Sequence, residues 1–399
     1  MSEIRVTNVI GENGSSPVNF TQGINMSGIV TATSFVPTVG QLSHRNKVIN
    51  GAMNICQRAV SENNISASGY YIADRFNINM VNVGSFRTNL FQSTQSPDGF
   101  NNSLGVSIGT GTAGAIASSE RVSLEQRIES QNLQDLAFGT SAAKSFTLSF
   151  YVRSTRTGQY GINMRQHDSG KDYNEKFDIS SANTWERKII TVTGNTGDTF
   201  ADDNGIGLWF RIMLRAGSNS VGNVNYQSWG SSDDDKAPTG QQTTWGTDAS
   251  DEFYLTGVQL EVGSVATPFE HKSEQEELLR CYRYYFKMGK LDYKGTHMAA
   301  NEVYGIGMSD NDNTNIYCQI NFPVPMREPP STLDQAGASN YNVRRDTTQT
   351  CTGNPSLTSG SEFSFRVNFP KSSHGWGTGQ MLWCMSAGSS SYLGFSAEL

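Results

Sequence analysis

Apolar and polar residues alternate over several stretches of the chain, which is the pattern of a β-strand with one buried face. In residues 145–155, the apolar side chains from Phe146 to Val152 fall on every second position, and Thr, Ser and Tyr fill the positions between. Similar patterns, separated by Gly, Asn or Asp turn residues, occur in WERKIITVTG (185–194), GIGLWFRIML (205–214) and EFYLTGVQLEV (252–262). Several strands without intervening helices predict an antiparallel β-sandwich, with jelly-roll strand order as the expected topology.

One helix is predicted directly after the last of these strands. Ser273 stands three residues before Glu276, which is the capping-box spacing that satisfies free backbone donors at a helix start. The pattern predicts a helix over residues 273–287 with one apolar and aromatic face. Side chains on that face are candidates for contacts between subunits: Leu278, Tyr282 and Tyr285.

The C-terminal part of the chain again has the pattern of strands. EFSFRVNF alternates with a period of two, which places Phe363, Phe365, Val367 and Phe369 on one face. Residues 381–399 are rich in aromatic and apolar side chains. Chain ends are usually mobile unless they dock, so this composition predicts burial at a subunit interface or at a tip.

These patterns divide the chain into four regions. Residues 1–44 hold short apolar pieces separated by Gly, Asn, Ser and Pro, and such pieces cannot bury enough surface to fold alone. They are therefore predicted to form an extended N-terminal anchor that needs a partner chain. The other predicted regions are the sandwich at 45–271, a connecting amphipathic helix at 272–289 and a C-terminal β-rich domain at 290–399. The expected fold class is mainly β.

Composition agrees with a β-rich protein and narrows its partners. The 399-residue chain has 40 glycines and only 17% charged residues, which suits strands joined by tight turns. Its net charge of −7 argues against nucleic acid or an anionic membrane as a partner, because both favour clustered Lys and Arg. MSEIRVTNVI lacks a basic start followed by an apolar core, and no apolar run reaches the length of a membrane span. We therefore expect a protein that is made in the cytoplasm without membrane insertion.

The cysteines and histidines do not form the common metal motifs. The five cysteines are widely spaced and contain no CxxC pair, so free and mostly buried thiols are expected. The five histidines are scattered, and none stands at the helical i, i+4 spacing. We predict no metal site and no cofactor.

Fragments of catalytic motifs occur, but their surroundings do not match. GVSIG at 105–109 fits GxSxG, yet a glycine-rich stretch rather than a helix follows Ser107. GTGTAG at 109–114 fits GxGxxG without the alternating strands and helices of a dinucleotide-binding fold. Acidic residues between Asp168 and Asp178 leave glycan cleavage as the less favoured alternative to a protein without enzymatic activity.

Aromatic side chains in polar loops are the candidate binding residues. Sugar rings stack on exposed aromatic faces, while neighbouring polar side chains bind the hydroxyl groups. The loop aromatics fit glycan binding and the closing of sandwich ends equally well, whereas Trp185 and Trp209 lie within strand patterns and are expected in the core. The glycan-binding candidates are Tyr226, Trp229, Trp245, Trp376 and Trp383.

Several sequence blocks resemble a family of bacteriophage tail-fibre and tail-associated structural proteins. The opening MSEIRVTNVIGENG and GINMSGIVTATSF resemble the N-terminal segments of fibre and appendage proteins from marine viruses that infect cyanobacteria. FPVPMR, at 322–327, looks like the C-terminal part of the same tail proteins. Further blocks resemble the family in the same order: NKVINGAMNICQRAVS, GYYIADRF, LEQRIESQNLQDLAFGTSAAKSFTLSFYVRS and GVQLEVGSVATPFEH.

This resemblance implies a structural protein of the virion. The expected role is a tail fibre or receptor-binding appendage, whose sandwich resembles carbohydrate-binding modules and contacts a host-surface glycan or protein receptor. The resemblance also implies a homotrimer that is attached to other tail proteins through residues 1–44. A head or tail decoration protein without receptor binding is the alternative, and a glycan depolymerase tailspike is a further, less favoured one.

Overall fold

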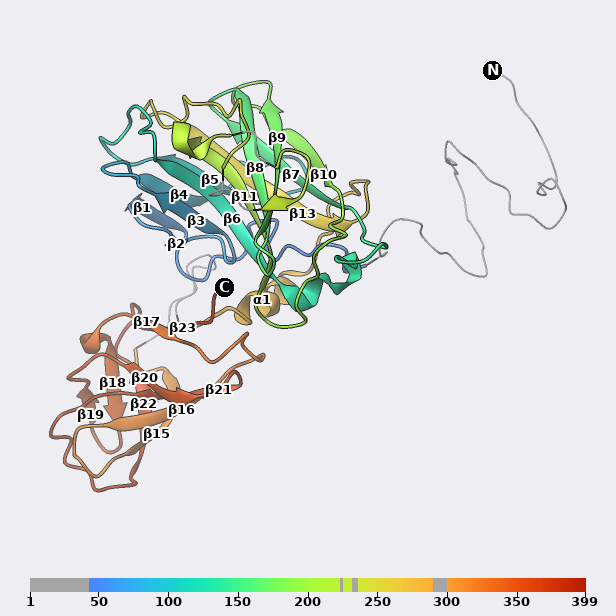
Figure 1. Ribbon diagram of the computed structural model, residues 1–399. Coiled ribbons are helices and arrows are strands. Elements are labelled where there is room, and N and C mark those ends of the chain that lie inside the picture. Colours follow the sequence, from blue (N-terminus) through green and yellow to red (C-terminus); the bar gives the residue numbers. More distant parts are fainter. Residues whose placement is uncertain (1–42, 223–224, 232–235, 290–299) are drawn as a thin grey trace, which may run out of the picture. The chain divides into compact units, whose positions relative to one another are not determined.

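The computed structural model describes residues 43–222, 225–231, 236–289 and 300–399 (Figure 1). The predicted anchor at 1–44 lies almost entirely outside the described residues, so its role stays a prediction. Within the described ranges strands dominate, and the α-helical part is the short helix α1 (Glu274–Tyr282). None of the helices in these ranges is long and apolar enough to cross a membrane. The prediction of a mainly β chain is therefore confirmed.

The first sheet has six strands, and each neighbouring pair is antiparallel. Its central strand, the last of the predicted sandwich, pairs with a different strand on each side. The spatial order is β1 (Ser61–Ile65), β4 (Thr88–Ser93), β5 (Ser103–Ile108), β13 (Glu252–Val262), β7 (Phe146–Ser154) and β10 (Glu186–Val192).

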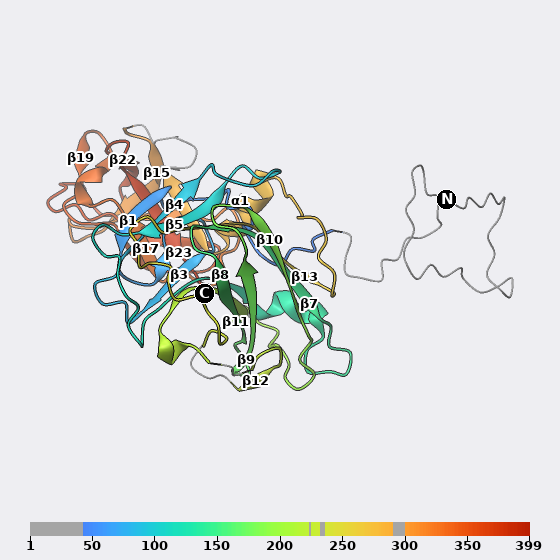
Figure 2. The same cartoon turned by 90° about the horizontal axis from the view of Figure 1, so that it is seen from above.

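The second sheet has seven strands and is also antiparallel throughout. Figures 1 and 2 show both sheets from two directions. The spatial order is β12 (Gly230–Ser231), β9 (Lys171–Ile179), β8 (Gly158–Gln166), β11 (Ile206–Ala216), β6 (Arg121–Glu129), β3 (Asn77–Val81) and β2 (Gly69–Tyr70). Two short 3-10 helices, η1 (Ser130–Leu136) and η2 (Ser218–Ser220), follow β6 and β11.

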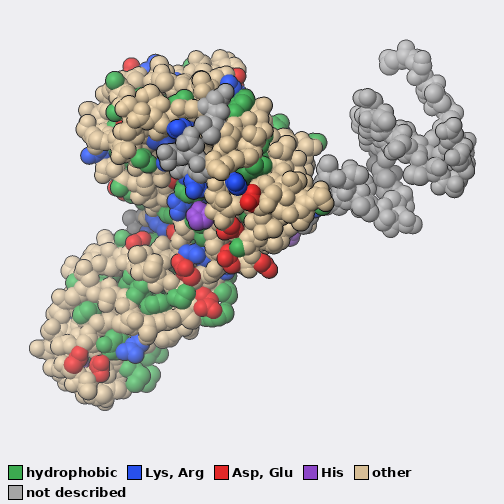
Figure 3. Space-filling model, viewed as in Figure 1, with side chains coloured by type: hydrophobic (Ala, Val, Ile, Leu, Met, Phe, Trp, Pro, Cys, Tyr) green, Lys and Arg blue, Asp and Glu red, His purple; other side chains and the backbone are tan. Residues whose placement is uncertain are grey.

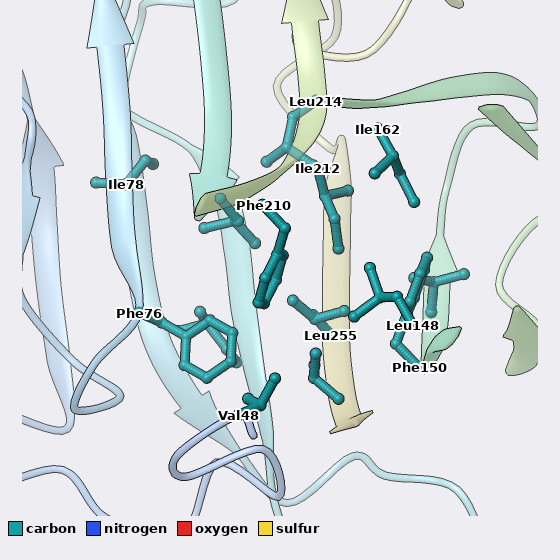
Figure 4. Packing of buried hydrophobic residues seen from close by; sticks show 14 of the residues in the cluster. Val48, Phe76, Ile78, Leu148, Phe150, Ile162, Phe210, Ile212, Leu214 and Leu255 are labelled. Atoms are coloured by element: carbon teal, nitrogen blue, oxygen red, sulfur yellow. The ribbon is translucent and has the colours of Figure 1, made fainter. Parts of the chain in front are cut away.

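The two sheets share one hydrophobic core. Figure 4 shows Phe210 of the second sheet lying next to Leu255 of the first, with further buried side chains such as Phe76 and Leu148 on either side. Each large apolar side chain that is fully buried in this way contributes about 1.5–3 kcal/mol to stability. The inward residues predicted for β7 are all buried in this core: Phe146, Leu148, Phe150 and Val152. The predicted antiparallel sandwich is therefore confirmed.

The junction after β13 begins as predicted. The Ser273 hydroxyl oxygen accepts a hydrogen bond from the backbone N–H of Glu276 at 3.2 Å, so Ser273 caps α1. Just before the helix, the Glu270 carboxylate accepts hydrogen bonds from the backbone N–H of Asn46 at 2.9 Å and from Lys272 Nζ at 3.0 Å. Glu270 thereby fastens the start of the sandwich to the segment that leads into the helix.

The helix predicted over 273–287 is too long at its C-terminal end. α1 ends at Tyr282, and Tyr285–Gly289 form strand β14 instead. β14 pairs antiparallel with β23 (Tyr392–Ser396). Gly394 of β23 leaves room for the Tyr285 ring, because a Cβ at Gly394 would lie 2.1 Å from the Tyr285 hydroxyl. Aromatic residues favour strands when a partner strand is present, and this partner comes from a distant part of the sequence.

This correction changes the predicted contacts between subunits. Tyr285 is buried within its own chain, with 1% of its surface exposed, so its assignment to an oligomer interface is wrong. Leu278 and Tyr282 are half-buried on α1. The Tyr282 ring meets Phe286 of the same chain edge to face, at 5.0 Å between ring centres. Their part in an oligomer stays a prediction.

The C-terminal region contains two further antiparallel sheets around a core of their own. The smaller one has the order β14, β23, β17 (Thr332–Gln335). The larger has the order β19 (Thr348–Thr350), β18 (Tyr341–Arg344), β22 (Met381–Ser386), β15 (Val303–Ser309), β16 (Ile316–Asn321), β21 (Ser364–Asn368) and β20 (Ser356–Gly360). The 3-10 helix η4 (Ala338–Asn340) precedes β18.

One residue of the predicted EFSFRVNF face is misplaced. Phe365, Val367 and Phe369 are buried as expected. Phe363 is 58% exposed, because β21 begins only at Ser364 and the alternation does not extend before the strand.

Residues 392–399 are buried or half-buried, but against their own chain. The Glu398 carboxylate forms ion pairs with Arg58, at 3.3 Å, and with Arg75, whose side chain is almost fully buried. The Arg75 guanidinium also lies over the Tyr284 ring, with Cζ 3.5 Å from the ring centre. Within the predicted segment 381–399, residues 392–399 are thus covered by their own chain, whereas Met381 and Trp383 are exposed. Burial at a subunit interface stays a prediction.

Gly51 allows a close approach to β13, which can be tested by adding a methyl group. A Cβ at Gly51 would lie 2.1 Å from the carbonyl oxygen of Val258. We expect Gly51→Ala to lower the free energy of unfolding, measured by urea denaturation, by about 1–3 kcal/mol, as overpacking does. Gly114→Ala is the matched control, because nothing lies within 4 Å of its added Cβ. Equal losses in the two variants would contradict the steric argument.

Glu270 makes stability depend on pH in acid. Burial raises the pKa of Glu270, but hydrogen bonds from the Asn46 N–H and from Lys272 outweigh it and lower the pKa to about 2 from an ordinary 4.5. The stabilisation is therefore complete above pH 4.5 and is lost as the pH falls toward 2. We expect the urea midpoint of the unsubstituted protein to fall more steeply across this range than that of Glu270→Gln. Parallel curves would disprove the assignment.

Candidate functional site

The outward face of the seven-stranded sheet carries a row of polar and aromatic side chains. Along β11, Leu208, Phe210 and Ile212 point into the core, so the residues between them point away from it. These are Trp209 and Arg211. The sequence therefore brings an indole and a guanidinium to the side of a central strand that faces away from the core.

The strand register places complementary side chains on both sides of this pair. Trp209 is paired with Arg127 of β6 and with Arg165 of β8. In the next outward row, Arg211 is paired with Glu125 of β6 and with Asn163 of β8. We refer to Trp209, Arg211, Arg127, Glu125 and Asn163 as the Trp209 face.

Two guanidinium groups lie against the Trp209 ring. Arg211 Cζ lies 3.5 Å from the ring centre and Arg127 Cζ lies 4.6 Å from it, distances typical of cation–π contacts. The indole Nε1–H donates a hydrogen bond to the Glu125 carboxylate. The indole is thus held in one orientation, and arginine side chains lie beside it.

A buried ion pair fixes the centre of the Trp209 face. Arg211 Nε and Glu125 Oε2 are 3.2 Å apart, and both side chains are fully buried. Burial raises the pKa of Glu125, while the charge of Arg211 and then that of Arg127 oppose the shift. Arg211 Nη1 also donates to Asn163 Oδ1 at 3.2 Å, and Asn163 Nδ2 donates to Asn174 Oδ1 on β9 at 2.8 Å. A continuous polar network therefore crosses four strands.

Several buried oxygen atoms beside this network have no hydrogen-bond partner among the described residues. They are Asn77 Oδ1 and Asn79 Oδ1 on β3, and Ser123 Oγ and Glu125 Oε1 on β6. The register pairs Asn77 with Glu125 and Asn79 with Ser123, so the four side chains are neighbours on one surface. Buried polar atoms without partners are costly, and each of these atoms can accept a hydrogen bond.

A cleft of about 680 Å³ adjoins the Trp209 face at Arg127. Its basic side chains are largely paired with acids of the same chain, since Lys47 Nζ lies 2.7 Å from Asp135 and Arg283 binds Glu129 with two contacts of 2.7 Å. Lys and Arg side chains are also visible on the sandwich in Figure 3. The cleft therefore widens the polar surface around Arg127 without a strong excess of positive charge.

Together these groups have the chemistry of a site for a polyhydroxylated ligand. Arginine N–H groups donate hydrogen bonds, the unpartnered oxygens accept them, and the rim of an indole supplies apolar contact. Within the described ranges, no group of three or more His, Cys, Asp or Glu side chains is arranged to hold a metal ion.

Trp245 is not available for ligand binding. It was predicted as a loop aromatic, but its side chain is fully buried and packs against Phe86 at 6.5 Å between ring centres. The assignment of Trp245 to a glycan site is therefore wrong, and the alternative role in packing is the one observed. A single sequence does not distinguish the two roles for a large aromatic residue in a loop.

Tyr226 and Trp229 lie near β9 rather than on the Trp209 face. Trp229 packs against Phe138 and Tyr173, with ring centres 5.7 and 5.5 Å away, and its Nε1–H donates to the carbonyl of Thr193 at 2.7 Å. Tyr226 is half-buried, with Lys176 Nζ 5.2 Å from its ring centre. Trp229 is thus largely occupied by packing, and Tyr226 keeps a partly open ring.

The two C-terminal candidates lie on a different part of the fold. Trp376 is half-buried and stacks on His374, with ring centres 5.4 Å apart. Trp383, on β22, is 46% exposed, and Arg344 Cζ lies 5.7 Å from its ring centre. The structure therefore does not gather the five predicted aromatic residues into one site.

The sequence interpretation missed Trp209, which was expected in the core. Trp209 and Trp185 are both half-buried and outside the buried core. Arg211 could have shown that Trp209 points outward. It stands two residues after Trp209, and residues two apart on a strand lie on the same face. An arginine on that face indicates that the tryptophan beside it points outward.

Ser107, Asp168 and Asp172, from a motif fragment and the acidic stretch, lie in or against the sandwich strands. Ser107 of the GVSIG fragment lies inside β5, whereas a nucleophile elbow needs a turn from a strand into a helix. Asp168 accepts hydrogen bonds from the Ser130 hydroxyl and the Ala201 N–H, both at 2.9 Å. Asp172 is buried on β9.

Comparisons with known proteins give distant structural similarity only. No protein-family model and no curated protein matches this chain. The enzymatically active domain of tailspike protein 4 from bacteriophage CBA120 matches with a TM-score of 0.26 and 11% identity, over 54% of this chain and 21% of that chain. A family 11 carbohydrate-binding module from Clostridium thermocellum, in complex with a mixed-linked tetrasaccharide, matches with a TM-score of 0.25 and 10% identity, over 53% and 99%.

A third match is the CBM22-2 xylan-binding domain of Paenibacillus barcinonensis Xyn10C, with a TM-score of 0.25 and 12% identity over 47% of this chain and 91% of that chain. The structural neighbours thus include carbohydrate-binding modules and a phage tailspike. This chain covers 21% of the length of the tailspike chain. TM-scores of this size carry no argument about function. The functional argument therefore depends on the residues of the Trp209 face.

The ion pair at the centre of the Trp209 face can be tested by double substitution. Arg211→Met leaves the Glu125 carboxylate buried without its cation, so we expect the free energy of unfolding to fall by about 3–5 kcal/mol. Combining it with Glu125→Leu removes the unpaired charge, and we expect the double variant to be more stable than Arg211→Met in urea denaturation. A double variant less stable than the single one would show that the charges are not coupled.

Proposed function

We propose that this chain is a carbohydrate-binding attachment protein that holds a host-surface glycan on the Trp209 face. The observation that carries the proposal is the half-buried Trp209 ring with two arginines against it, beside oxygens of Asn77, Asn79, Ser123 and Glu125 that have no hydrogen-bond partner among the described residues. A saccharide offers hydroxyl groups that both donate and accept hydrogen bonds, so it can satisfy the oxygens and the arginines together.

The Trp209 face is already ordered for such binding. The Glu125 carboxylate and the Arg211 guanidinium hold the indole, so little conformational freedom is lost when a ligand arrives. In this proposal the half-buried Arg127 donates to ring hydroxyls, Trp209 covers an apolar face of the sugar, and the half-buried Asn79 accepts from a further hydroxyl. Arg211 is fully buried and holds the indole in place.

Binding without cleavage fits the acidic groups of this surface. A glycosidase needs one carboxyl group with a raised pKa as the acid and a second one nearby. Burial raises the pKa of Glu129, but hydrogen bonds from Arg283 and Tyr284 outweigh it and lower the pKa below its ordinary value. Glu125 is occupied by Trp209 and Arg211. The contacts to Glu129 hold it as a hydrogen-bond acceptor, while Glu125, whose pKa burial raises, is fully buried and bound to Arg211.

The sequence resemblance supports placing this function on a virion. Under the proposal, residues 1–44 attach the chain to other tail proteins, the assembled form is a homotrimer, and the sandwich contacts the host surface. A decoration protein of the head or tail that lacks receptor binding is the competing function. Imaging of labelled protein on the virus particle separates the two by position.

Glycan binding is tested with the full chain on an array of host-surface and reference polysaccharides. We expect binding to at least one glycan and a loss of affinity of about 10-fold or more in Trp209→Ala, as for a central aromatic contact. Trp185→Ala is the matched control, because Trp185 is also half-buried but precedes β10 of the other sheet. We expect its affinity to be unchanged.

Two outcomes would contradict the proposal. Unchanged glycan binding in Trp209→Ala would remove the Trp209 face as the site, and absence of binding to host cells and glycans would favour the decoration protein. Release of reducing sugar from a bound polysaccharide would instead establish cleavage.

A further inference from the structure

The larger C-terminal sheet carries large hydrophobic side chains on the face that its core does not use. Leu382 and Cys384 of β22 are buried in the C-terminal core, so Trp383 between them points to the other face. Four large apolar side chains of β15 and β22 are exposed: Ile306 and Met308, each 54%, Met381, 65%, and Trp383, 46%. Adjoining exposed apolar residues indicate an interaction surface more often than isolated ones do. Hydrophobic side chains are visible on the C-terminal region in Figure 3.

Two arginines stand at the ends of a row of side chains that crosses this face. Arg344 of β18 is paired with Trp383, and Trp383 is paired with Ile306. On the other side, Gln319 of β16 is paired with Arg366 of β21, and Gln319 lines the same groove as Ile306. The row therefore crosses five adjacent strands, a width of about 19 Å at a spacing of about 4.8 Å between neighbours. We call these five side chains the Arg344–Arg366 row.

Two shallow grooves lie along the row, and their linings match. The first has a volume of about 200 Å³ and the second of about 340 Å³, and Ile306 belongs to both. Each groove also has one aromatic ring, one methionine and one exposed arginine. These are Trp383, Met381 and Arg344 in the first groove, and Tyr317, Met308 and Arg366 in the second. The face therefore presents the same combination of groups twice, side by side.

Each of the two exposed arginines lies against the aromatic ring of its groove. Arg366 Cζ is 3.8 Å from the centre of the Tyr317 ring, and Arg344 Cζ is 5.7 Å from that of Trp383. Within the part of the chain that the structure describes, neither arginine forms an ion pair. Their planar guanidinium groups suit bidentate hydrogen bonds to an oxyanion such as a carboxylate.

The other charged side chains at the grooves leave this positive charge in excess. Among the described residues, Asp310 is the only acidic one that lines either groove, and its carboxylate accepts a hydrogen bond from the Asn311 N–H at 2.7 Å. Arg345, which lines the first groove, is paired with the exposed Asp346 at 3.6 Å. With the two arginines of the row, these groups make three guanidinium groups against two carboxylates. The face is therefore locally positive, although the chain has a net charge of −7.

We propose that the Arg344–Arg366 row binds an acidic polysaccharide, with charged sugar units in both grooves. Each arginine binds a carboxylate or sulfate group of the ligand, and Trp383 and Ile306 cover the apolar faces of sugar rings. The matching grooves favour a polymer with a repeating unit, because such a ligand presents the same groups at regular intervals. This site lies on a different sheet from the Trp209 face and does not depend on the function proposed there.

The position of the row favours a polysaccharide over an acidic peptide. Extended peptides are commonly bound at the edge of a sheet, where backbone groups are free to pair. The row instead crosses the middle of the sheet, where β22, β15 and β16 each have a neighbouring strand on both sides. A peptide would find no backbone partners there. A sugar ring needs only shallow apolar surface beside hydrogen-bond donors, which each groove provides.

The first test is isothermal titration calorimetry of the full chain with polygalacturonate, which carries one carboxylate per sugar. We expect an affinity that falls as sodium chloride is raised, because both arginines are exposed. Arg344→Gln and Arg366→Gln should each lower the affinity about 10-fold or more, as the loss of a charged hydrogen bond does. Trp383→Ala should also lower it. Arg187→Gln is the matched control, because Arg187 is an exposed arginine on β10 of the sandwich, and its affinity should be unchanged.

The second test asks whether one ligand occupies both grooves. A galacturonate oligomer long enough for the row is compared with galacturonate itself. Linked groups that bind two sites together bind more tightly than separate groups do, so we expect the oligomer to exceed the monomer about 100-fold or more in affinity. Arg344→Gln should remove most of this advantage and leave binding of the monomer in the second groove. An advantage that Arg344→Gln and Arg366→Gln both leave intact would disprove the two-groove arrangement.

Three further polymers identify the class of ligand. Tighter binding of dextran sulfate than of polygalacturonate would assign sulfate groups to the row, and the reverse would assign carboxylates. Uncharged dextran should show no binding that depends on the two arginines. Polyglutamate binding as tightly as both acidic polysaccharides, with the same dependence on the arginines, would show that the row binds acidic peptides instead.

Two other results would overturn the proposal. One is no binding of either acidic polysaccharide at low salt. The other is binding that Trp209→Ala abolishes while the arginine variants leave it unchanged, because the ligand would then occupy the Trp209 face. The substituted residues of the row are exposed, so far-ultraviolet circular dichroism should be the same in every variant. Loss of glycan binding at the Trp209 face alone leaves the proposal for the row intact.

Discussion

The structure depends on one geometric constraint, the two-residue period of a β-strand. In β7 and β11 every second side chain fills the core between the sheets, and this burial supplies most of the driving force for folding. The same period forces the intervening residues outward. Trp209 and Arg211 point away from the core because Leu208, Phe210 and Ile212 point into it.

Both surfaces discussed above arise from that constraint, with different chemistry. On the seven-stranded sheet of the sandwich, the outward positions hold arginine, asparagine and carboxylate groups that form a hydrogen-bonded network. On the larger C-terminal sheet, the outward positions of β15 and β22 hold apolar side chains that no described residue covers. The first surface suits a ligand that is held mainly by hydrogen bonds, whereas the second also gains from the exclusion of water over its apolar side chains.

The sequence predicted those parts of the structure that depend on local pattern. The strands of the sandwich, the inward face of β7 and the Ser273 cap of α1 all follow from neighbouring residues. Features that depend on distant partners were missed. Tyr285 enters a strand because Gly394 accommodates its ring, and Glu125 meets Arg211, 86 positions away, only once β6 and β11 are in register. Trp245 was misjudged because its burial depends on loops whose paths the pattern does not specify.

The Glu398 ion pairs have a consequence for how the chain folds. Arg58 and Glu398 are 340 positions apart, so this contact forms only after almost the whole intervening chain has been organised. Contacts of such long sequence separation slow folding, since the entropy of closing the loop is lost before the contact compensates for it. Until then Arg75, deep in the sandwich, lacks its carboxylate partner. The buried charge of Arg75 in the sandwich is therefore paired with a carboxylate late in folding, when the C-terminal sheet docks.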